Sequence, residues 1–264
     1  MHRVLCSTGS LITRANGRNH RLLLGLAAQL DCDGFEFLIY EPWYAKLDEV
    51  TADIVSFGLT VPSVHCDKMI GELIANKDSK AFELFEINCR AAYALSAEKL
   101  VLHLWNGQIS DSNFDVNMAA YPQLAEIAAS YGLQLTVENV VCNCKSPLIH
   151  LTELMEKYPD IAFTFDTKMA EFHGEIIDCY DETLWSHICH LHINDYKGGI
   201  MDWSNLRTLH LGEGQINFDD FFAYVKKIGY TGDFTVEATS VQTDGTVDIN
   251  KLNADFLKIK GYIA

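Results

Sequence analysis

Short apolar runs alternate with longer segments of helical periodicity along the whole chain, and this alternation constrains the fold most. Eight runs have the length and composition of strands: residues 2–8, 34–40, 60–66, 99–105, 133–139, 161–167, 188–195 and 233–239. Strands that alternate with helices pair in parallel through right-handed crossovers. Eight such units in 264 residues fit a closed (β/α)8 barrel. We therefore expect residues 1–264 to form one α/β domain, a (β/α)8 TIM barrel.

The segments between these runs have apolar residues at helical spacing, which predicts helices at residues 19–30, 79–95, 121–131, 147–158, 218–228 and 250–260. Asn217 suits the N-terminal cap of the helix from residue 218, and Pro147 suits a first helical turn. A doubly wound open sheet is the alternative fold, and it usually has a glycine-rich phosphate loop after its first strand. Ser7-Thr-Gly-Ser10 is not such a loop, and Gly212-Glu-Gly214 is predicted to be a turn.

Charge and composition restrict the partners of the chain. The net charge of −16 argues against nucleic acid, because basic side chains supply most of the affinity for a phosphate backbone. No run reaches the roughly 18 apolar residues of a membrane helix, and the N-terminal segment has no export signal. We expect a cytoplasmic protein without a membrane partner, with a homo-oligomer left open. The eight cysteines form no Cys-x-x-Cys pair and are predicted to be reduced, buried thiols.

Ionisable side chains lie near the C-terminal ends of six predicted strands. They are His65, His103, Glu138, Asp166, His192 and Glu237. Side chains alternate between the two faces of a strand, so Thr136 and Glu138 share one face while Leu135 and Val137 share the other. If the apolar residues pack on the outer helices, the polar ones point into the barrel mouth. These groups are therefore expected to meet in one small volume.

Several carboxylates in one buried volume predict a cation that neutralises them. Glu138, Asp166, His192 and Glu237 combine three carboxylates with one imidazole. Such a set suits Mn²⁺, Zn²⁺, Co²⁺ or Mg²⁺, and we predict that these four residues bind a divalent metal ion. Glu36 and His190 are interpreted as hydrogen-bonded core residues, with a place for Glu36 at the mouth as the alternative.

Seven short segments resemble the xylose isomerase-like barrel superfamily in order and approximate spacing, over the whole chain. They are Ser63-Val-His65, Leu102-His103, Thr136-Val-Glu138-Asn139, Phe165-Asp166-Thr167, His192-Ile-Asn-Asp-Tyr-Lys197, His210-Leu-Gly-Glu-Gly214 and Val236-Glu237. The superfamily includes sugar isomerases and epimerases, inosose dehydratase and endonuclease IV. The resemblance implies that Glu138, Asp166, His192 and Glu237 are its shared metal ligands. His65 and His103 match the positions that hold a further zinc in endonuclease IV.

The resemblance implies a divalent-metal-dependent isomerase or epimerase that acts on a sugar, a sugar phosphate or a related hydroxy-ketone. Proton transfer would pass through an enediolate, with Glu138 and Glu237 as metal ligands and as the acid–base pair. The further candidates are His65, His103 and His210 for substrate hydroxyls, Trp105 and Tyr40 for an apolar wall, and Lys197 for a phosphate or carboxylate. Rim packing is the alternative role of the aromatic residues, and a solvated loop position is that of the lysine.

Three other functions are weighed against this one. A metal-dependent dehydratase of an inosose-like substrate would use the same strand-end residues. A non-catalytic sugar-binding protein would keep the barrel alone. An abasic-site endonuclease is disfavoured, since Met169, Leu206 and Thr208 stand where endonuclease IV needs ligands for a third zinc. Lys168 or His173 is the candidate for the polar contact that Met169 does not supply.

Overall fold

Eight parallel strands close into a barrel in the computed structural model, which describes residues 2–106 and 111–264. The strands are β1 (Val4–Ser7), β2 (Gly34–Leu38), β3 (Ser63–His65), β4 (Lys99–Leu102), β5 (Gln134–Glu138), β6 (Ala162–Asp166), β7 (Ile188–Ile193) and β8 (Asp233–Val236). Each strand pairs with the next, and β1 pairs with β8, where Leu5 lies opposite Thr235. The predicted (β/α)8 barrel is thus confirmed.

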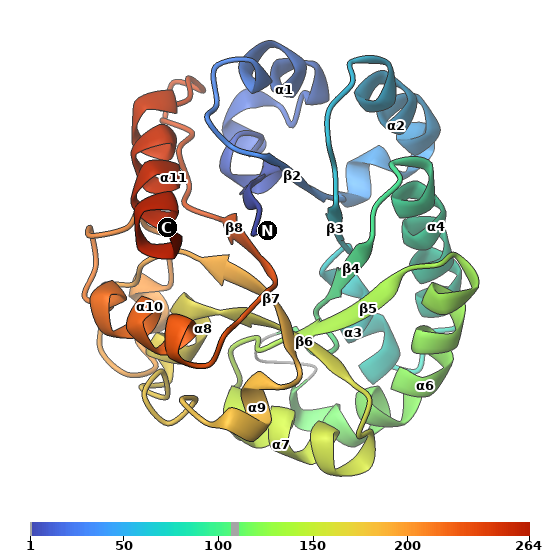
Figure 1. Ribbon diagram of the computed structural model, residues 1–264. Helices are drawn as coiled ribbons and strands as arrows, with labels where there is room; N and C mark the ends of the chain where they lie inside the picture. The colour runs from blue at the N-terminus through green and yellow to red at the C-terminus, as the bar shows by residue number, and fades with distance from the viewer. Residues whose placement is uncertain (1, 107–110) are drawn as a thin grey trace.

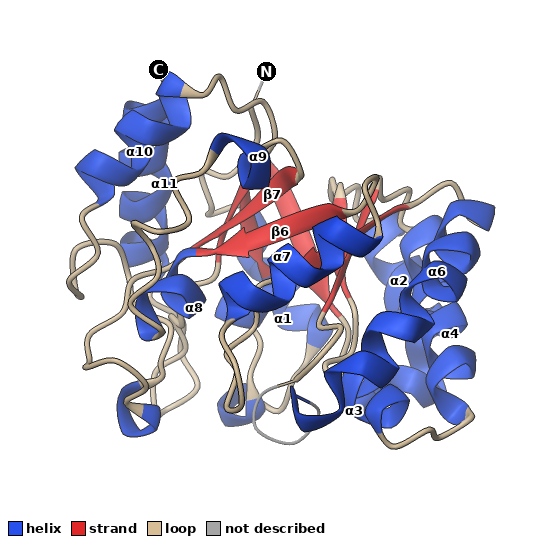
Figure 2. Cartoon of the chain, turned by 90° about the horizontal axis from the view of Figure 1, so that it is seen from below, coloured by secondary structure: helices blue, strands red, loops and turns tan. Residues whose placement is uncertain are grey.

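Helices surround the strands in the view along the barrel (Figure 1) and flank them in the perpendicular view (Figure 2). The α-helices are α1 (His20–Ala27), α2 (Leu47–Ser56), α3 (Met69–Ala75), α4 (Lys80–Ala94), α6 (Phe114–Ser130), α7 (Pro147–Lys157), α8 (Thr167–Phe172), α9 (Glu182–Trp185), α10 (Phe218–Lys227) and α11 (Ile249–Ile263). Short 3-10 helices are η1 (Thr8–Ser10), η2 (Arg14–Asn16), η3 (Glu41–Lys46), η4 (Asp111–Asn113) and η5 (Trp203–Asn205). The six predicted helices are present, whereas α2, α3, α8 and α9 were not predicted.

Helix α6 begins seven residues earlier than predicted, and Pro122 therefore lies inside the helix. Proline lacks the backbone N–H that would bond to the carbonyl four residues before it. That carbonyl belongs to Met118, and the hydroxyl of Tyr158 donates to it at 2.8 Å. A side chain from outside the helix therefore replaces the missing bond.

The predicted roles of Asn217 and Pro147 at helix starts, and the predicted turn, agree with the structure. Asn217 Oδ1 accepts the backbone N–H of Asp220 at the start of α10, and Pro147 occupies the first turn of α7. The segment Gly212–Gly214 is a turn held by Asp195, whose Oδ2 accepts the N–H groups of Gly212 and Gly214 at 2.9 Å each. The eight cysteines are free thiols, as predicted, but the expected burial fails for Cys144, which is exposed, and is only partial for Cys32 and Cys189.

The barrel interior carries polar layers beneath its mouth. Thr136 and Thr164 share a hydrogen bond of 2.7 Å across neighbouring strands, and Thr235 bonds to His190 at 2.9 Å. The apolar side chains of the same strands face the helices, and Leu135 and Val137 are buried there in the hydrophobic core. This is the alternation that the sequence predicted. Within the described residues, no helix is long and apolar enough to cross a membrane.

Candidate metal centre

Four side chains from neighbouring strands converge at the C-terminal end of the barrel. Glu138 and Asp166 are the last residues of β5 and β6, His192 lies near the end of β7, and Glu237 directly follows β8. One ligand atom of each residue lies within 4.8 Å of those of the other three. The structure thus brings together all four residues that the sequence predicts as metal ligands.

The donor set fits a divalent cation. Three carboxylates and an imidazole meet here, and three of the four residues are fully buried, which is costly for so much negative charge without a cation. Two donor atoms that each lie about 2.1 Å from the same ion are at most about 4.2 Å from each other. The four ligand atoms therefore need to approach one another only slightly to bind one ion. Oxygen donors with one imidazole suit Mn²⁺, Mg²⁺, Co²⁺ or Zn²⁺. Metal binding by these residues remains a prediction.

Glu138 is surrounded by three imidazoles. Its Oε2 lies 2.8 Å from His103 Nε2 and 3.1 Å from His65 Nε2, and its Oε1 lies 3.3 Å from His192 Nδ1. Burial alone would raise the pKa of Glu138, but the adjacent imidazoles outweigh it and lower the pKa well below its ordinary value. Burial lowers the pKa of His103 to about 4. Glu138 is therefore held as a carboxylate.

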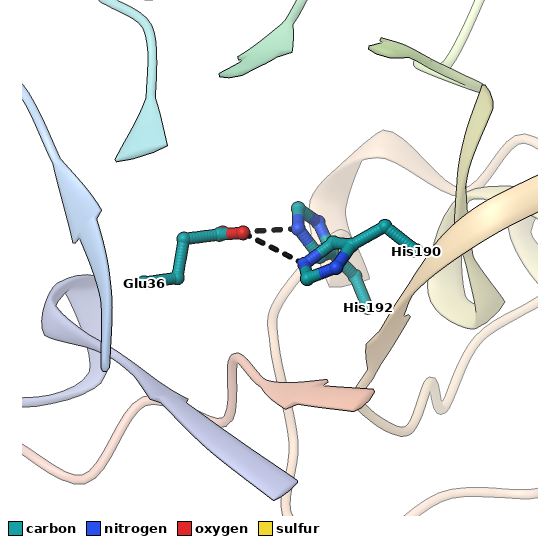
Figure 3. Close-up of side chains that lie close together, drawn as sticks. All are labelled: Glu36, His190 and His192. Carbon is teal, nitrogen blue, oxygen red and sulfur yellow. Dashed lines mark hydrogen bonds and ion pairs between the residues drawn. The ribbon is translucent and has the colours of Figure 1, made fainter. Parts of the chain in front are cut away.

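Glu36 lies beneath this group and contacts two histidines of β7 (Figure 3). Its Oε2 lies 2.8 Å from His190 Nε2 and accepts the Ser63 hydroxyl, also at 2.8 Å. Its Oε1 lies 3.0 Å from His192 Nε2, close enough for an ion pair but not aligned as a hydrogen bond. Glu36 and His190 are the hydrogen-bonded interior residues that the sequence predicts. The contact between Glu36 and a predicted ligand was not foreseen.

The two nitrogens of His192 face different groups. Nδ1 points at Glu138 and lies 3.6 Å from Glu237 Oε2, whereas Nε2 points at Glu36. A neutral imidazole with its proton on Nε2 would present the Nδ1 lone pair to a cation. A carboxylate beside the other nitrogen is the usual means of fixing that tautomer in metal sites.

Asp166 is fixed by the start of α8 and by β7. Its Oδ1 accepts the backbone N–H of Met169 at 2.9 Å, and its Oδ2 accepts Asn194 Nδ2 at 3.1 Å. Lys168, which the sequence suggested for an additional polar contact, places Nζ 3.7 Å from Oδ2 and is buried. His173, the other candidate, is bonded instead to the backbone N–H of Cys142.

Three predicted substrate contacts have other surroundings in the structure: one is buried in the core, one is bonded within the protein and one lies on an exposed loop. Trp105 is wholly buried, and its ring packs on Phe114 and His150, so it does not form a wall against a sugar. His210 uses both ring nitrogens within the protein, at Asp255 and at Ser240. Lys197 is exposed on the loop after β7. The sequence placed these residues by chain position, which does not fix side-chain direction beyond the strand ends.

A cavity of about 790 Å³ opens beside Glu237, one of the four predicted ligands. Glu237 and Tyr40 line it, together with Arg14, Arg18 and Lys68. The Tyr40 hydroxyl donates to the Ile12 carbonyl at 2.7 Å, and a role of this ring as a wall against a sugar stays a prediction. The volume suits a small polar ligand.

Residues 24–258 match the sequence pattern of the xylose isomerase-like TIM barrel family. The chain belongs to this family. The match extends from α1 into α11 and so includes all four converging residues. The resemblance found in the sequence is thereby confirmed for family and fold.

Solved structures of this family's fold superpose on nearly the whole chain. A D-tagatose 3-epimerase-like protein aligns with a TM-score of 0.74 at 19% identity, covering 99% of this chain and 97% of that one. D-allulose 3-epimerase from Methylomonas sp., in complex with D-allulose, gives 0.75 at 18% identity and the same coverage. The IolI protein with a bound zinc atom gives 0.70 at 15%, covering 99% of this chain and 96% of that one. These likenesses establish the fold.

One relative is similar in sequence. The uncharacterized protein MJ1311 of Methanocaldococcus jannaschii is 29% identical over 165 residues, which is 57% of this chain. The chain spans about half of that relative, 54% of its length.

Proposed function

We propose that the chain is a divalent-metal-dependent isomerase or epimerase that moves a proton next to the carbonyl of a sugar or related hydroxy-ketone. The convergence of Glu138, Asp166, His192 and Glu237 beside an open cavity is the observation that carries this proposal. The family and the fold, shared with a D-tagatose 3-epimerase-like protein and D-allulose 3-epimerase, support it. A cation held there would stabilise negative charge on the substrate oxygens as a Lewis acid.

The two glutamates are placed differently, which suggests different roles. Glu237 lines the cavity, its side chain is 13% exposed, and it can meet a substrate directly. Glu138 is 1% exposed and contacts His65, His103 and His192. We assign Glu237 as the group that takes or returns the substrate proton on the cavity side. Glu138 would act on the other face of the substrate once ligand binding rearranges its imidazole contacts.

His65 and His103 would complete this second proton path. Nε2 of each ring faces Glu138 Oε2, so the two histidines can stabilise the charge of this carboxylate. The low pKa of His103, caused by its burial, favours a neutral ring that can also hydrogen-bond to a substrate hydroxyl. In this proposal the two histidines bind substrate through the same edge that now faces Glu138.

The test is a panel of ketoses, ketose phosphates and polyol ketones, followed for isomerisation, epimerisation, water loss and uptake of solvent deuterium at the carbon next to the carbonyl. Wild-type protein with Mn²⁺ is expected to exchange deuterium into one substrate. Glu237→Gln and Glu138→Gln should each lose about 100-fold or more in turnover, the scale of acid–base catalysis. Glu156→Gln, on the exposed face of α7, is the matched control and should match wild type.

Three results would overturn the proposal. Binding of a sugar without turnover or exchange would indicate a non-catalytic sugar-binding protein. Release of water from the substrate, without uptake of solvent deuterium into the remaining substrate, would indicate a dehydratase. Metal-dependent incision of abasic-site DNA, with no change in any sugar, would indicate a nuclease.

A further inference from the structure

Three cations line the cavity beside the candidate metal centre. Arg14 lies in η2 and Arg18 in the turn that follows, both in the connection from β1 to α1, and Lys68 precedes α3. They line the same 790 Å³ volume as Glu237. A ligand in contact with Glu237 therefore occupies a space with three positive side chains in its wall. This is notable in a chain whose net charge is −16.

None of these three cations is neutralised by the described part of the protein. No carboxylate in residues 2–106 and 111–264 forms an ion pair with Arg14, Arg18 or Lys68, and their side chains make no hydrogen bond there. By contrast, Arg3 and Lys99 at the opposite end of the barrel share Asp233. The cavity cations are thus free to bind an anion.

Arg18 is held in place before any ligand arrives. Its guanidinium carbon lies 4.4 Å above the centre of the Tyr40 ring, a cation–π contact. Its backbone has φ of 49° and is fixed by two bonds, from its own N–H to Thr13 O at 2.9 Å and from Trp43 Nε1 to its carbonyl at 3.1 Å. The side-chain Nε is buried without a partner. Arginine is the usual side chain for binding phosphate or carboxylate, and the guanidinium of Arg18 is already positioned by its contact with Tyr40.

Three acidic residues share the wall, but none of them forms an ion pair with Arg14, Arg18 or Lys68. Asp67 is buried, and its Oδ1 accepts the backbone N–H of Met69 at 3.0 Å, so it is committed to the start of α3. Glu41 is exposed at the start of η3. Glu237 belongs to the predicted metal site, where a cation would compensate it.

We propose that Arg14, Arg18 and Lys68 form an anion subsite, and that the substrate is a sugar phosphate whose ester group binds there. A phosphate monoester carries about −1.5 to −2 charges at neutral pH and three acceptor oxygens, which matches three cationic donors. Lys197, the sequence candidate for this role, lies exposed on the loop after β7 instead. The inference rests on the proposed function only in that the sugar end of this ligand would reach Glu237.

The test measures binding by calorimetry with three probes: inorganic phosphate, D-fructose 6-phosphate and D-fructose. Each is titrated into wild type, Arg18→Gln, the double variant Arg14→Gln/Arg18→Gln, and Lys68→Met. We expect fructose 6-phosphate to bind wild type at least about tenfold more tightly than fructose, and each single variant to lose about tenfold for the phosphate probes. Fructose binding should change less than about twofold.

Arg21→Gln is the matched control, because it removes the same charge from an exposed arginine on α1 that pairs with Glu49 outside the cavity. It should bind all probes as wild type does. The titrations are repeated on metal-free protein. Phosphate binding that disappears without the metal is assigned to the metal and not to the three cations. Unchanged thermal unfolding and Mn²⁺ affinity would show that the variants are folded.

Two results would overturn the anion subsite. One is equal affinity for fructose and fructose 6-phosphate, and the other is phosphate binding in Arg18→Gln equal to that of wild type. Turnover of neutral ketoses without phosphate binding would leave the isomerase proposal standing while the subsite fails. Phosphate binding through Arg18 without turnover of any sugar would leave the anion subsite standing while the isomerase proposal fails.

Discussion

Glu36 Oε1 lies 3.0 Å from His192 Nε2, the ring nitrogen that does not face Glu138 (Figure 3). Both side chains are fully buried. Burial alone would raise the pKa of Glu36, but His192 and His190 outweigh it and lower the pKa well below the ordinary value. Glu36 is therefore a fixed negative charge beside the ring nitrogen of His192 that faces away from the predicted metal site.

Replacing Glu36 by glutamine should weaken Mn²⁺ binding about 10- to 100-fold, the usual effect of removing a carboxylate behind a ligating histidine. Calorimetric titration with Mn²⁺ measures this change. Ser63→Ala is the control, because it removes a different partner of Glu36 without touching His192. Equal Mn²⁺ affinity in wild type and Glu36→Gln, with both proteins folded, would show that Glu36 does not position the ligand.

Removing the metal should lower thermal stability. A ligand at 100 times its Kd stabilises the native state by about 2.7 kcal/mol, which corresponds to about 5–10 °C in Tm for a chain of this size. Differential scanning calorimetry with Mn²⁺ and with EDTA would measure the shift. The variant Asp166→Asn should show little or no shift, since it lacks one of the four donors. A shift of the same size in that variant would place the stabilising ion elsewhere.

Stability should fall in acid through Asp233, at the end of the barrel opposite the candidate site. Burial would raise the pKa of Asp233, but Arg3 at 2.8 Å and Lys99 at 2.7 Å outweigh it and lower the pKa below the ordinary value. A carboxyl with a lowered folded pKa stabilises the protein above its unfolded pKa of about 3.9, and this stability is lost as the pH falls further. The free energy of unfolding of the protein is therefore expected to fall below about pH 4.

Asp233→Asn tests this assignment. The variant should lose about 1–3 kcal/mol at pH 7, because Arg3 is partly exposed and its charge is screened, and it should lose less than wild type on going to pH 3.5. Urea unfolding of metal-free protein at both pH values measures the difference. Glu98→Gln removes the exposed partner of Arg3 and should cost less than about 1 kcal/mol. Parallel pH profiles of wild type and Asp233→Asn would contradict the assignment.

The hydroxyl of Tyr158 should matter only because of Pro122. Tyr158→Phe leaves the Met118 carbonyl without its 2.8 Å bond and should cost about 1–2 kcal/mol. In a Pro122→Ala background the backbone N–H returns and can take that carbonyl, so the same substitution should cost clearly less. A double-mutant cycle from urea unfolding measures the coupling, and independent, additive effects would rule it out.

The sequence predicted the strand ends better than the surroundings of the site. Glu138, Asp166, His192 and Glu237 were found because strand direction and alternation fix where such side chains point. Glu36 was left in the core, because a single acid in an apolar run gives no sign of which histidine it meets across the barrel. For Trp105 the sequence left a sugar wall and packing open, because β4 ends at Leu102 and alternation no longer fixes its direction; the structure shows packing. The unpaired Arg14 and Arg18 depend on the path of a loop, which periodicity does not encode.

The most direct test of the account is Mn²⁺ binding to wild type and to Asp166→Asn, measured by calorimetry on protein freed of metal. Asp166 contributes one of four donors that lie within 4.8 Å of one another, while Asp160 is exposed just before β6, so Asp160→Asn is the matched control. The account predicts a tight site filled by one ion per chain in wild type and in Asp160→Asn, weakened about 100-fold or more in Asp166→Asn. Absence of a tight site in wild type, or equal affinity in all three proteins, would contradict it.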